Sequence, residues 1–203
     1  ELSFVEYETA RRLAAELRAV GVEVTENVGG TGIVGMLRNG EGPLVLVRAD
    51  MDGLPVKEAT GLPYASKAVF ETPDGMKLPV MHACGHDVHM TAMVGTAHQL
   101  VRLKDRWSGT VMFVGQPAEE RIGGARAMLR DRLYERFGVP DAAFALHVSA
   151  GKPAGTSSGN NCSLLARPRN IDRGLLPTRT LSRFSVCRTS RRREARRASA
   201  SAS

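Results

Sequence analysis

The stretch MHACGHDVH, residues 81–89, contains a thiol, three imidazoles and a carboxylate within nine residues. Its Cys84-x-His86 pair places two kinds of metal ligand on one turn, but two ligands do not complete a zinc site. The remaining ligands must come from elsewhere, and the chain offers Glu119-Glu120 in GQPAEER and His147 in FALHVS. If these stretches converge in the fold, they form a metal site.

Cys84, His86, Glu120 and His147 together offer thiolate, imidazole and carboxylate ligands. This mixture suits a borderline divalent ion, with Zn²⁺ as the first choice and Mn²⁺ or Co²⁺ as alternatives. Adjacent glutamates cannot both point the same way along a regular element. One can therefore bind the metal while the other faces a bound water and takes its proton. The pattern predicts metal-assisted hydrolysis rather than a closed structural site.

The elements that must position these residues alternate between strands and helices. An apolar strand at residues 44–47 runs into Arg48-Ala49-Asp50-Met51-Asp52, where Asp52 is the stronger functional candidate and Asp50 the weaker. Two further strands, at residues 110–114 and 142–146, end at the glutamate pair and at His147. Helices are expected at residues 3–20, 88–103 and 124–136. This alternation predicts an α/β sheet whose strand ends converge at one edge.

Other patterns have more ordinary interpretations. His89 and His98 on the second helix are interpreted as packing or surface residues rather than ligands. Residues 30–35 form a G-x-G-x-x-G pattern, but the residues that follow resemble a strand, so we expect a glycine-rich hairpin and no nucleotide cofactor. Ser3 and Glu6 match a capping box at the start of the first helix. Residues 53–80, rich in Gly and Pro, are expected to form an irregular loop.

The net charge of +7 is unevenly distributed. Residues 162–203 hold 11 Arg and 2 acidic residues, a balance of +9, whereas residues 1–161 hold 17 basic and 19 acidic residues, a balance of −2. We therefore expect a metallohydrolase-type domain at 1–161 and an Arg/Ser-rich tail at 162–203 that is disordered or frame-shifted. The body gives no electrostatic reason to expect nucleic acid as a partner.

Three cysteines form no disulfide framework, which favours a reducing compartment, and we expect a cytoplasmic protein. No apolar run approaches the ~18 residues of a membrane span, so no membrane association is expected. The chain begins at Glu1 inside an expected helix start, which suggests a fragment or a processed chain.

The motifs RADMDGLPV, MHACGHDVHM, GQPAEE and FALHV resemble, in order, those of the dinuclear-metal amidohydrolase and aminoacylase superfamily of metallopeptidases. The similarity is to the branch of hippurate hydrolase and the indole-acetyl-amino-acid hydrolases, and it covers roughly residues 1–156. It implies an α/β fold, in which this chain supplies part of a three-layer, mixed-sheet catalytic domain of the zinc-exopeptidase type.

The resemblance also implies roles. Cys84, His86, Glu120 and His147 would bind two divalent metal ions (Zn, Mn or Co), and Glu119 would be the general base. Asp52 would lie near the metals and orient one of their ligands without binding a metal itself. The substrate would be a small N-acylated amino acid, whose amide is hydrolysed to a carboxylic acid and the free amino acid.

The sequence also departs from the family pattern. Family members insert a lid and homodimerisation domain and supply a last histidine ligand, whereas all five histidines here lie at or before His147. We therefore expect a truncated chain without the dimer interface and with impaired activity, the alternative being a metal-binding but inactive fragment. Two rival readings are a cysteine hydrolase with Cys84 as nucleophile and a nucleic-acid module that uses the tail.

Overall fold

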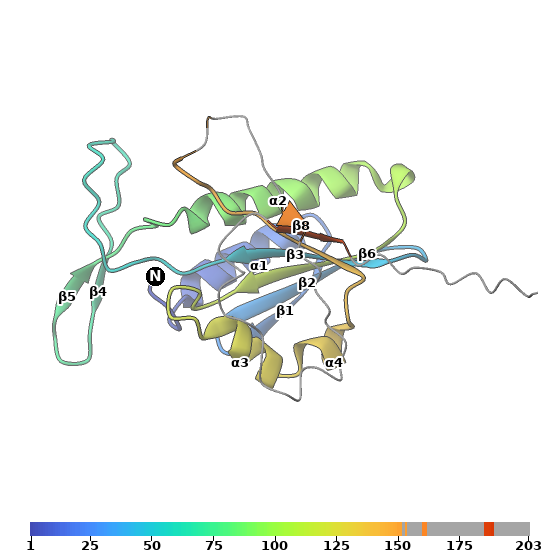
Figure 1. Cartoon of the computed structure of the whole chain (residues 1–203). Helices are drawn as coiled ribbons and strands as arrows, with labels where there is room; N and C mark the ends of the chain where they lie inside the picture. Colours follow the sequence, from blue (N-terminus) through green and yellow to red (C-terminus); the bar gives the residue numbers. More distant parts are fainter. Residues whose placement is uncertain (152, 154–159, 162–184, 189–203) are drawn as a thin grey trace, which may run out of the picture.

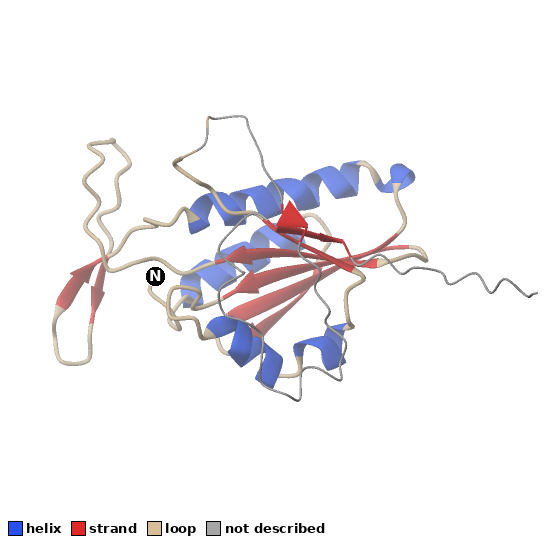
Figure 2. Ribbon diagram, viewed as in Figure 1, coloured by secondary structure: helices blue, strands red, loops and turns tan. Residues whose placement is uncertain are grey.

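The computed structural model of the chain describes residues 1–151, 153, 160–161 and 185–188. Within these residues a mixed sheet lies between two layers of helices (Figures 1 and 2). Its strand order is β1-β2-β6-β3-β7-β9-β8. These strands are β1 (Glu23–Val28), β2 (Gly32–Asn39), β3 (Leu44–Asp50), β6 (Gly109–Gln116), β7 (Ala142–Ala145), β8 (Asn160–Asn161) and β9 (Ser185–Arg188).

Strand β3 occupies the centre of the part of the sheet that carries the site. It runs parallel to β6 on one side and to β7 on the other, with Asp50 opposite Gln116. The carboxyl ends of β3, β6 and β7 therefore lie at the same edge of the sheet. The expectation of an α/β fold with a mixed sheet and a buried central strand is confirmed.

Helices cover both faces of the sheet. Helices α1 (Tyr7–Ala19) and α2 (His86–Arg102) pack on one face, and α3 (Gly124–Arg130) and α4 (Leu133–Phe137) pack on the other (Figure 1). A 3-10 turn, η1 (Lys104–Arg106), follows α2. Helix α1 buries one stripe because its apolar residues recur at helical spacing: Ala10, Leu13, Ala14 and Leu17.

The strands divide their side chains between the two layers because successive residues of a strand point to opposite faces. In β6, Val111 and Phe113 contact the α1 and α2 layer, whereas Met112 and Val114 contact the α3 and α4 layer. This alternation gives the domain one core on each side of the sheet. The sheet is thereby packed on both faces beside the edge where the candidate residues lie.

Three expectations from the sequence were wrong. The first helix begins at Tyr7, not Ser3, and its first turn is capped by the carboxylate of Glu1, which accepts the backbone N–H groups of Glu8 and Thr9, rather than by Ser3 and Glu6. The loop at 53–80 contains a small hairpin of β4 (Val69–Glu71) and β5 (Lys77–Pro79), which projects from the body (Figure 1). The helix expected at 124–136 is broken, because Arg132 takes a left-handed conformation (φ +61°) between α3 and α4.

The glycine-rich stretch forms the expected hairpin, since β1 and β2 pair antiparallel around it. The tail expected at 162–203 lies outside the described residues, except for β9, which pairs antiparallel with β7. No helix among the described residues is both long and apolar enough to span a membrane.

Candidate metal centre

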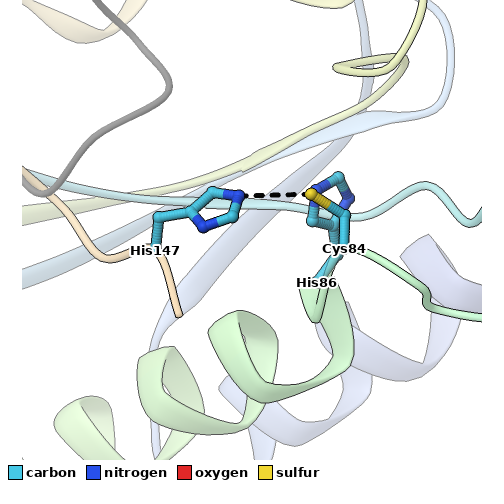
Figure 3. Close-up of side chains that lie close together, drawn as sticks. All are labelled: Cys84, His86 and His147. Atoms are coloured by element: carbon cyan, nitrogen blue, oxygen red, sulfur yellow. Dashed lines mark hydrogen bonds between the residues drawn. The ribbon is translucent and has the colours of Figure 1, made fainter. Parts of the chain in front are cut away.

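The candidate residues gather at the carboxyl edge of β3, β6 and β7. Asp52 follows β3, the glutamate pair follows β6, and His147 follows β7, while Cys84 and His86 lie at the start of α2. Figure 3 shows Cys84, His86 and His147 side by side, with the Cys84 Sγ 3.3 Å from the His147 Nε2. Sequence stretches more than sixty residues apart are therefore adjacent, as the strand-end argument predicted.

His86, the first residue of α2, is completely buried. Its Nδ1 lies 2.7 Å from the backbone oxygen of Asp52, which can only accept a hydrogen bond, so Nδ1 carries the proton and donates. In the neutral imidazole the lone pair is then on Nε2, which has no hydrogen-bond partner among the described residues. A metal-binding histidine is usually held in this way, with its other ring N–H donating to a backbone oxygen, a carboxylate or a water.

Three carboxylates surround the His86 Nε2. It lies 3.6 Å from an oxygen of Asp50, 3.9 Å from Glu119 and 3.8 Å from Glu120. Burial alone lowers the pKa of His86, but the hydrogen bond to Asp52 and the charges of Asp50 and Asp52 outweigh burial and raise it. A lone pair that faces several negative oxygens is unfavourable unless a cation lies between them.

His147 has the same arrangement as His86. Its Nδ1 lies 2.6 Å from the backbone oxygen of Val148, so Nδ1 donates and Nε2 points at Cys84. Burial, followed by the charge of the Glu120 carboxylate, raises the pKa of the Cys84 thiol to about 11. Without a cation the thiol is therefore protonated at neutral pH, which disfavours Cys84 as a free nucleophile.

The loop after β6 presents the glutamate pair. Both side chains are about one-fifth exposed, yet one Glu120 oxygen is buried and makes no hydrogen bond within the described part of the chain. Burial raises the pKa of Glu119, and the charges of Asp50 and Glu120 add to this effect. A carboxylate with a raised pKa is better suited to accept a proton from water.

Asp52 connects the β3 end to this loop. One of its oxygens accepts hydrogen bonds from the Ser3 hydroxyl at 2.6 Å and from the Glu120 backbone N–H at 3.0 Å. Burial by itself raises its pKa, but the hydrogen bonds from His86, Ser3 and the glutamate backbone lower it overall. Asp52 therefore remains ionised and contacts the backbone of one candidate ligand and the ring of another.

A second buried network lies behind these residues. The Arg48 guanidinium lies 3.0 Å from Asp50, whose other oxygen is 2.6 Å from the Nδ1 of His89. The Nε2 of His89 accepts the Val148 backbone N–H at 3.0 Å, so both ring nitrogens are engaged. Burial alone raises the pKa of Asp50, but the hydrogen bond from His89 and the charge of Arg48 lower it to about 2.

This network contains the residues that sequence reasoning had ranked low or not considered: Arg48, Asp50 and His89. His89 lies three residues after His86 on α2, so the two rings share a helix face, and their centroids are 5.4 Å apart. That spacing was visible in the sequence. Its significance was not, because a lone helical histidine is usually a packing residue.

The donor set fits a divalent cation. Three groups place their ligand atoms within 4.8 Å of one another: Cys84, His86 and His147; His86, Glu119 and Glu120; and Asp50, His86 and His89. The first two share His86, and they combine the soft and borderline ligands expected of Zn²⁺ or a similar ion. The third is the least suited, because both nitrogens of His89 already have partners.

Comparisons with known proteins identify the family of the chain. The model of peptidase family M20/M25/M40 matches residues 46–170. Thermostable carboxypeptidase 1 of Saccharolobus solfataricus is 41% identical over 172 residues, covering 83% of this chain and 41% of that protein. Hippurate hydrolase of Campylobacter jejuni is 44% identical over 138 residues, covering 68% of this chain and 33% of that protein.

Among solved structures, the Bacillus subtilis YXEP protein, described as a dinuclear metal-binding peptidase of the M20 family, superposes with a TM-score of 0.65. It is 37% identical, and the match covers 75% of this chain and 40% of that one. The chain thus spans between a third and two fifths of the length of the curated relatives described above.

Proposed function

Because this chain belongs to peptidase family M20/M25/M40, we propose that it forms the metal-binding part of an amidohydrolase that cleaves N-acyl amino acids. The observation that carries the proposal is the pair of histidines, His86 and His147. Each has its Nδ1 held by a backbone oxygen, and each Nε2 lies beside Cys84 or the acidic groups.

In this proposal Cys84, His86, Glu120 and His147 hold two divalent ions, with Zn²⁺ first and Mn²⁺ or Co²⁺ as alternatives. The chemistry supplied by such ions is Lewis acidity, which lowers the pKa of water and polarises a carbonyl group. The raised pKa of the Cys84 thiol supports its role, because a cation is then needed to stabilise the thiolate.

Glu119 is proposed as the general base. Its carboxylate accepts a proton from the attacking water and then donates it to the nitrogen of the departing amino acid. The raised pKa of this largely buried carboxyl group supports the role, because its carboxylate is a stronger base than that of an exposed glutamate. Asp52 keeps the His86 ring oriented, and it holds the Glu120 backbone through a hydrogen bond.

The substrate class is drawn from the relatives. Hippurate hydrolase is named for an N-acylated glycine, and the carboxypeptidase is named for removing a residue that carries a free carboxylate. Both names describe an amide whose amine side is an amino acid. We therefore propose a small N-acyl amino acid as the substrate, with no nucleotide cofactor and no nucleic-acid partner.

The test is elemental analysis of the purified chain after incubation with Zn²⁺, together with hydrolysis of N-benzoylglycine. Wild type is expected to retain bound Zn²⁺, and Glu120→Ala is expected to lose most of it. Glu119→Gln should keep the metal but lose turnover by about 10²–10⁴-fold. Glu16→Ala, which changes an exposed glutamate of α1, is the matched control and should resemble wild type.

Two outcomes would count against the proposal. A folded wild-type chain without bound metal would refute the metal site, and so would a Glu120→Ala variant with unchanged metal content. Metal binding without hydrolysis of any N-acyl amino acid would favour the alternative, a metal-binding chain without catalysis.

A further inference from the structure

The six residues before α1 contact both loops that carry the candidate site. The backbone oxygen of Glu1 accepts the Gly53 N–H at 2.7 Å, and the Ser3 hydroxyl donates to Asp52 at 2.6 Å. Glu6 reaches the other loop, where its Oε1 accepts the Ala118 backbone N–H at 2.8 Å. Residues 1–6 therefore link the end of β3 to the end of β6.

Glu6 is the unusual member of this segment, because its carboxylate is completely buried. A buried acidic side chain needs several hydrogen-bond donors, and Glu6 has three. Its Oε1 accepts the backbone N–H groups of Phe4 and Ala118, and its Oε2 accepts the hydroxyl of Thr31 from the β1–β2 turn. None of these partners belongs to the proposed metal ligands.

Ala118 is the residue immediately before the glutamate pair, and its backbone is strained. It has a φ of +46°, in the left-handed region that residues with a Cβ rarely adopt, and it is fully buried. Its carbonyl oxygen also accepts the N–H groups of Gly123 and Gly124, each at 3.2 Å, which closes the loop around the glutamates. Such a conformation persists only where its surroundings fix it.

We propose that Glu6 is a positioning residue, whose carboxylate holds Ala118 in its left-handed conformation and thereby directs Glu119 and Glu120 toward His86. The inference rests on the proposed function, because it assigns Glu6 a role through the base and the metal ligand. Ser3 supports the same loop from the other side, since Asp52 accepts both the Ser3 hydroxyl and the Glu120 N–H.

The variants follow from the hydrogen-bond pattern. Glu6→Ala removes the acceptor and leaves the buried Ala118 N–H unpaired. Glu6→Gln keeps an amide oxygen for the two N–H donors, while its NH₂ group can donate to the Thr31 oxygen. Thr31→Val is the control for general destabilisation, because it removes a buried hydrogen bond of the same carboxylate but leaves Ala118 held.

The experiment loads each variant with Co²⁺ and records its visible absorption spectrum, and it measures Co²⁺ affinity by competition with a chelator. Glu6→Ala should bind Co²⁺ at least tenfold more weakly than wild type, with a changed spectrum. Glu6→Gln and Thr31→Val should stay within threefold, with the wild-type spectrum. If Glu6→Ala does not fold, Glu6→Asp carries the same expectation, because its shorter side chain withdraws from Ala118.

Several results would overturn the inference. A folded Glu6→Ala, or Glu6→Asp in its place, with wild-type affinity and spectrum would show that the loop does not depend on Glu6. An equal loss in Thr31→Val would assign the effect to general destabilisation. If wild type itself binds no Co²⁺, the proposed function fails first and the inference fails with it.

Discussion

Replacing Gly85 with alanine should disturb the candidate site more than any other single methyl group added to α2. Gly85 lies between Cys84 and His86 and has a φ of +77°. A Cβ at this position would lie 2.3 Å from the Cγ2 of Val148, the residue that follows His147. The substitution is therefore expected to displace Cys84, His86 and His147 while leaving all three side chains unchanged.

The magnitude follows from two unfavourable effects and one favourable effect. A left-handed conformation costs a residue with a Cβ about 1–2 kcal/mol. Carbon atoms pack best at about 3.5 Å or more, so Val148 must move by about 1 Å, and such overpacking costs about 1–3 kcal/mol. The lower entropy of the unfolded chain returns about 0.4–1 kcal/mol. We expect a net loss of about 2–4 kcal/mol in the free energy of unfolding.

The matched control is Gly95→Ala, inside the helix that Gly85 precedes. Gly95 is exposed, and a Cβ there would meet no atom within 4 Å. The same chemical change should therefore stabilise the protein by about 0.5–1 kcal/mol. Urea unfolding of the metal-free chain, monitored by circular dichroism, measures the free energy of unfolding of both variants. Competition with a chelator gives their Zn²⁺ affinities.

We expect Gly85→Ala to bind Zn²⁺ at least tenfold more weakly and Gly95→Ala to bind it normally. The reasoning would be refuted if Gly85→Ala were as stable as wild type and bound Zn²⁺ equally well. In that case the contact between α2 and the segment after β7 would not constrain the site.

Three further outcomes are expected. Bound Zn²⁺ should stabilise the chain by about 4 kcal/mol when free Zn²⁺ is at one thousand times its Kd, and a chelator should remove this stabilisation. A urea-unfolding midpoint that does not change when the chelator is added would contradict the metal site. His89→Ala should release the Val148 N–H and weaken Zn²⁺ binding, whereas the exposed His98→Ala should not; equal affinities in a metal titration would count against this link. Arg48→Met should destabilise the metal-free chain by about 3–5 kcal/mol, because it leaves the buried Asp50 without its cation; urea unfolding measures this, and a loss below about 1 kcal/mol would be inconsistent with it.

Much of the fold could be predicted because its signals are local. Apolar runs identified β3, β6 and β7, and helical spacing identified α1 and α2 within a few residues of their observed bounds. The convergence of the candidate residues was also predictable, because parallel strands place their carboxyl ends at one edge. These inferences require only side-chain periodicity and a general rule of sheet topology.

The capping box at Ser3 and Glu6 failed for the opposite reason. The local pattern was present, but both side chains have distant partners: Ser3 bonds to Asp52, and Glu6 bonds to Ala118, 112 residues away. A buried carboxylate with three donors is more favourable than a solvent-exposed cap, so the tertiary contacts prevail. No local pattern could have indicated this.

The β4–β5 hairpin was missed because its strands have three residues each and alternate little between buried and exposed positions. The Arg48, Asp50 and His89 network was missed because its members look ordinary one at a time. Arg48 and Asp50 are two residues apart in one strand and so share a face. Only the packing of α2 against β3 brings His89 to them.

The distribution of charge at this edge explains why so many supporting contacts are needed. Asp50 has Arg48 as a nearby cation, and Asp52 accepts a hydroxyl and a backbone N–H. The two glutamates also face His86, and one Glu120 oxygen has no hydrogen-bond partner among the described residues. Buried acceptors that converge in this way repel one another, so the metal-free site opposes folding. Each loop is held from outside the site by a hydrogen bond: Asp52 accepts the Ser3 hydroxyl, Glu6 accepts the Ala118 N–H, and His89 accepts the Val148 N–H. A cation therefore binds to ligands that are already in position. Its binding removes the repulsion between the carboxylates that the hydrogen bonds hold together.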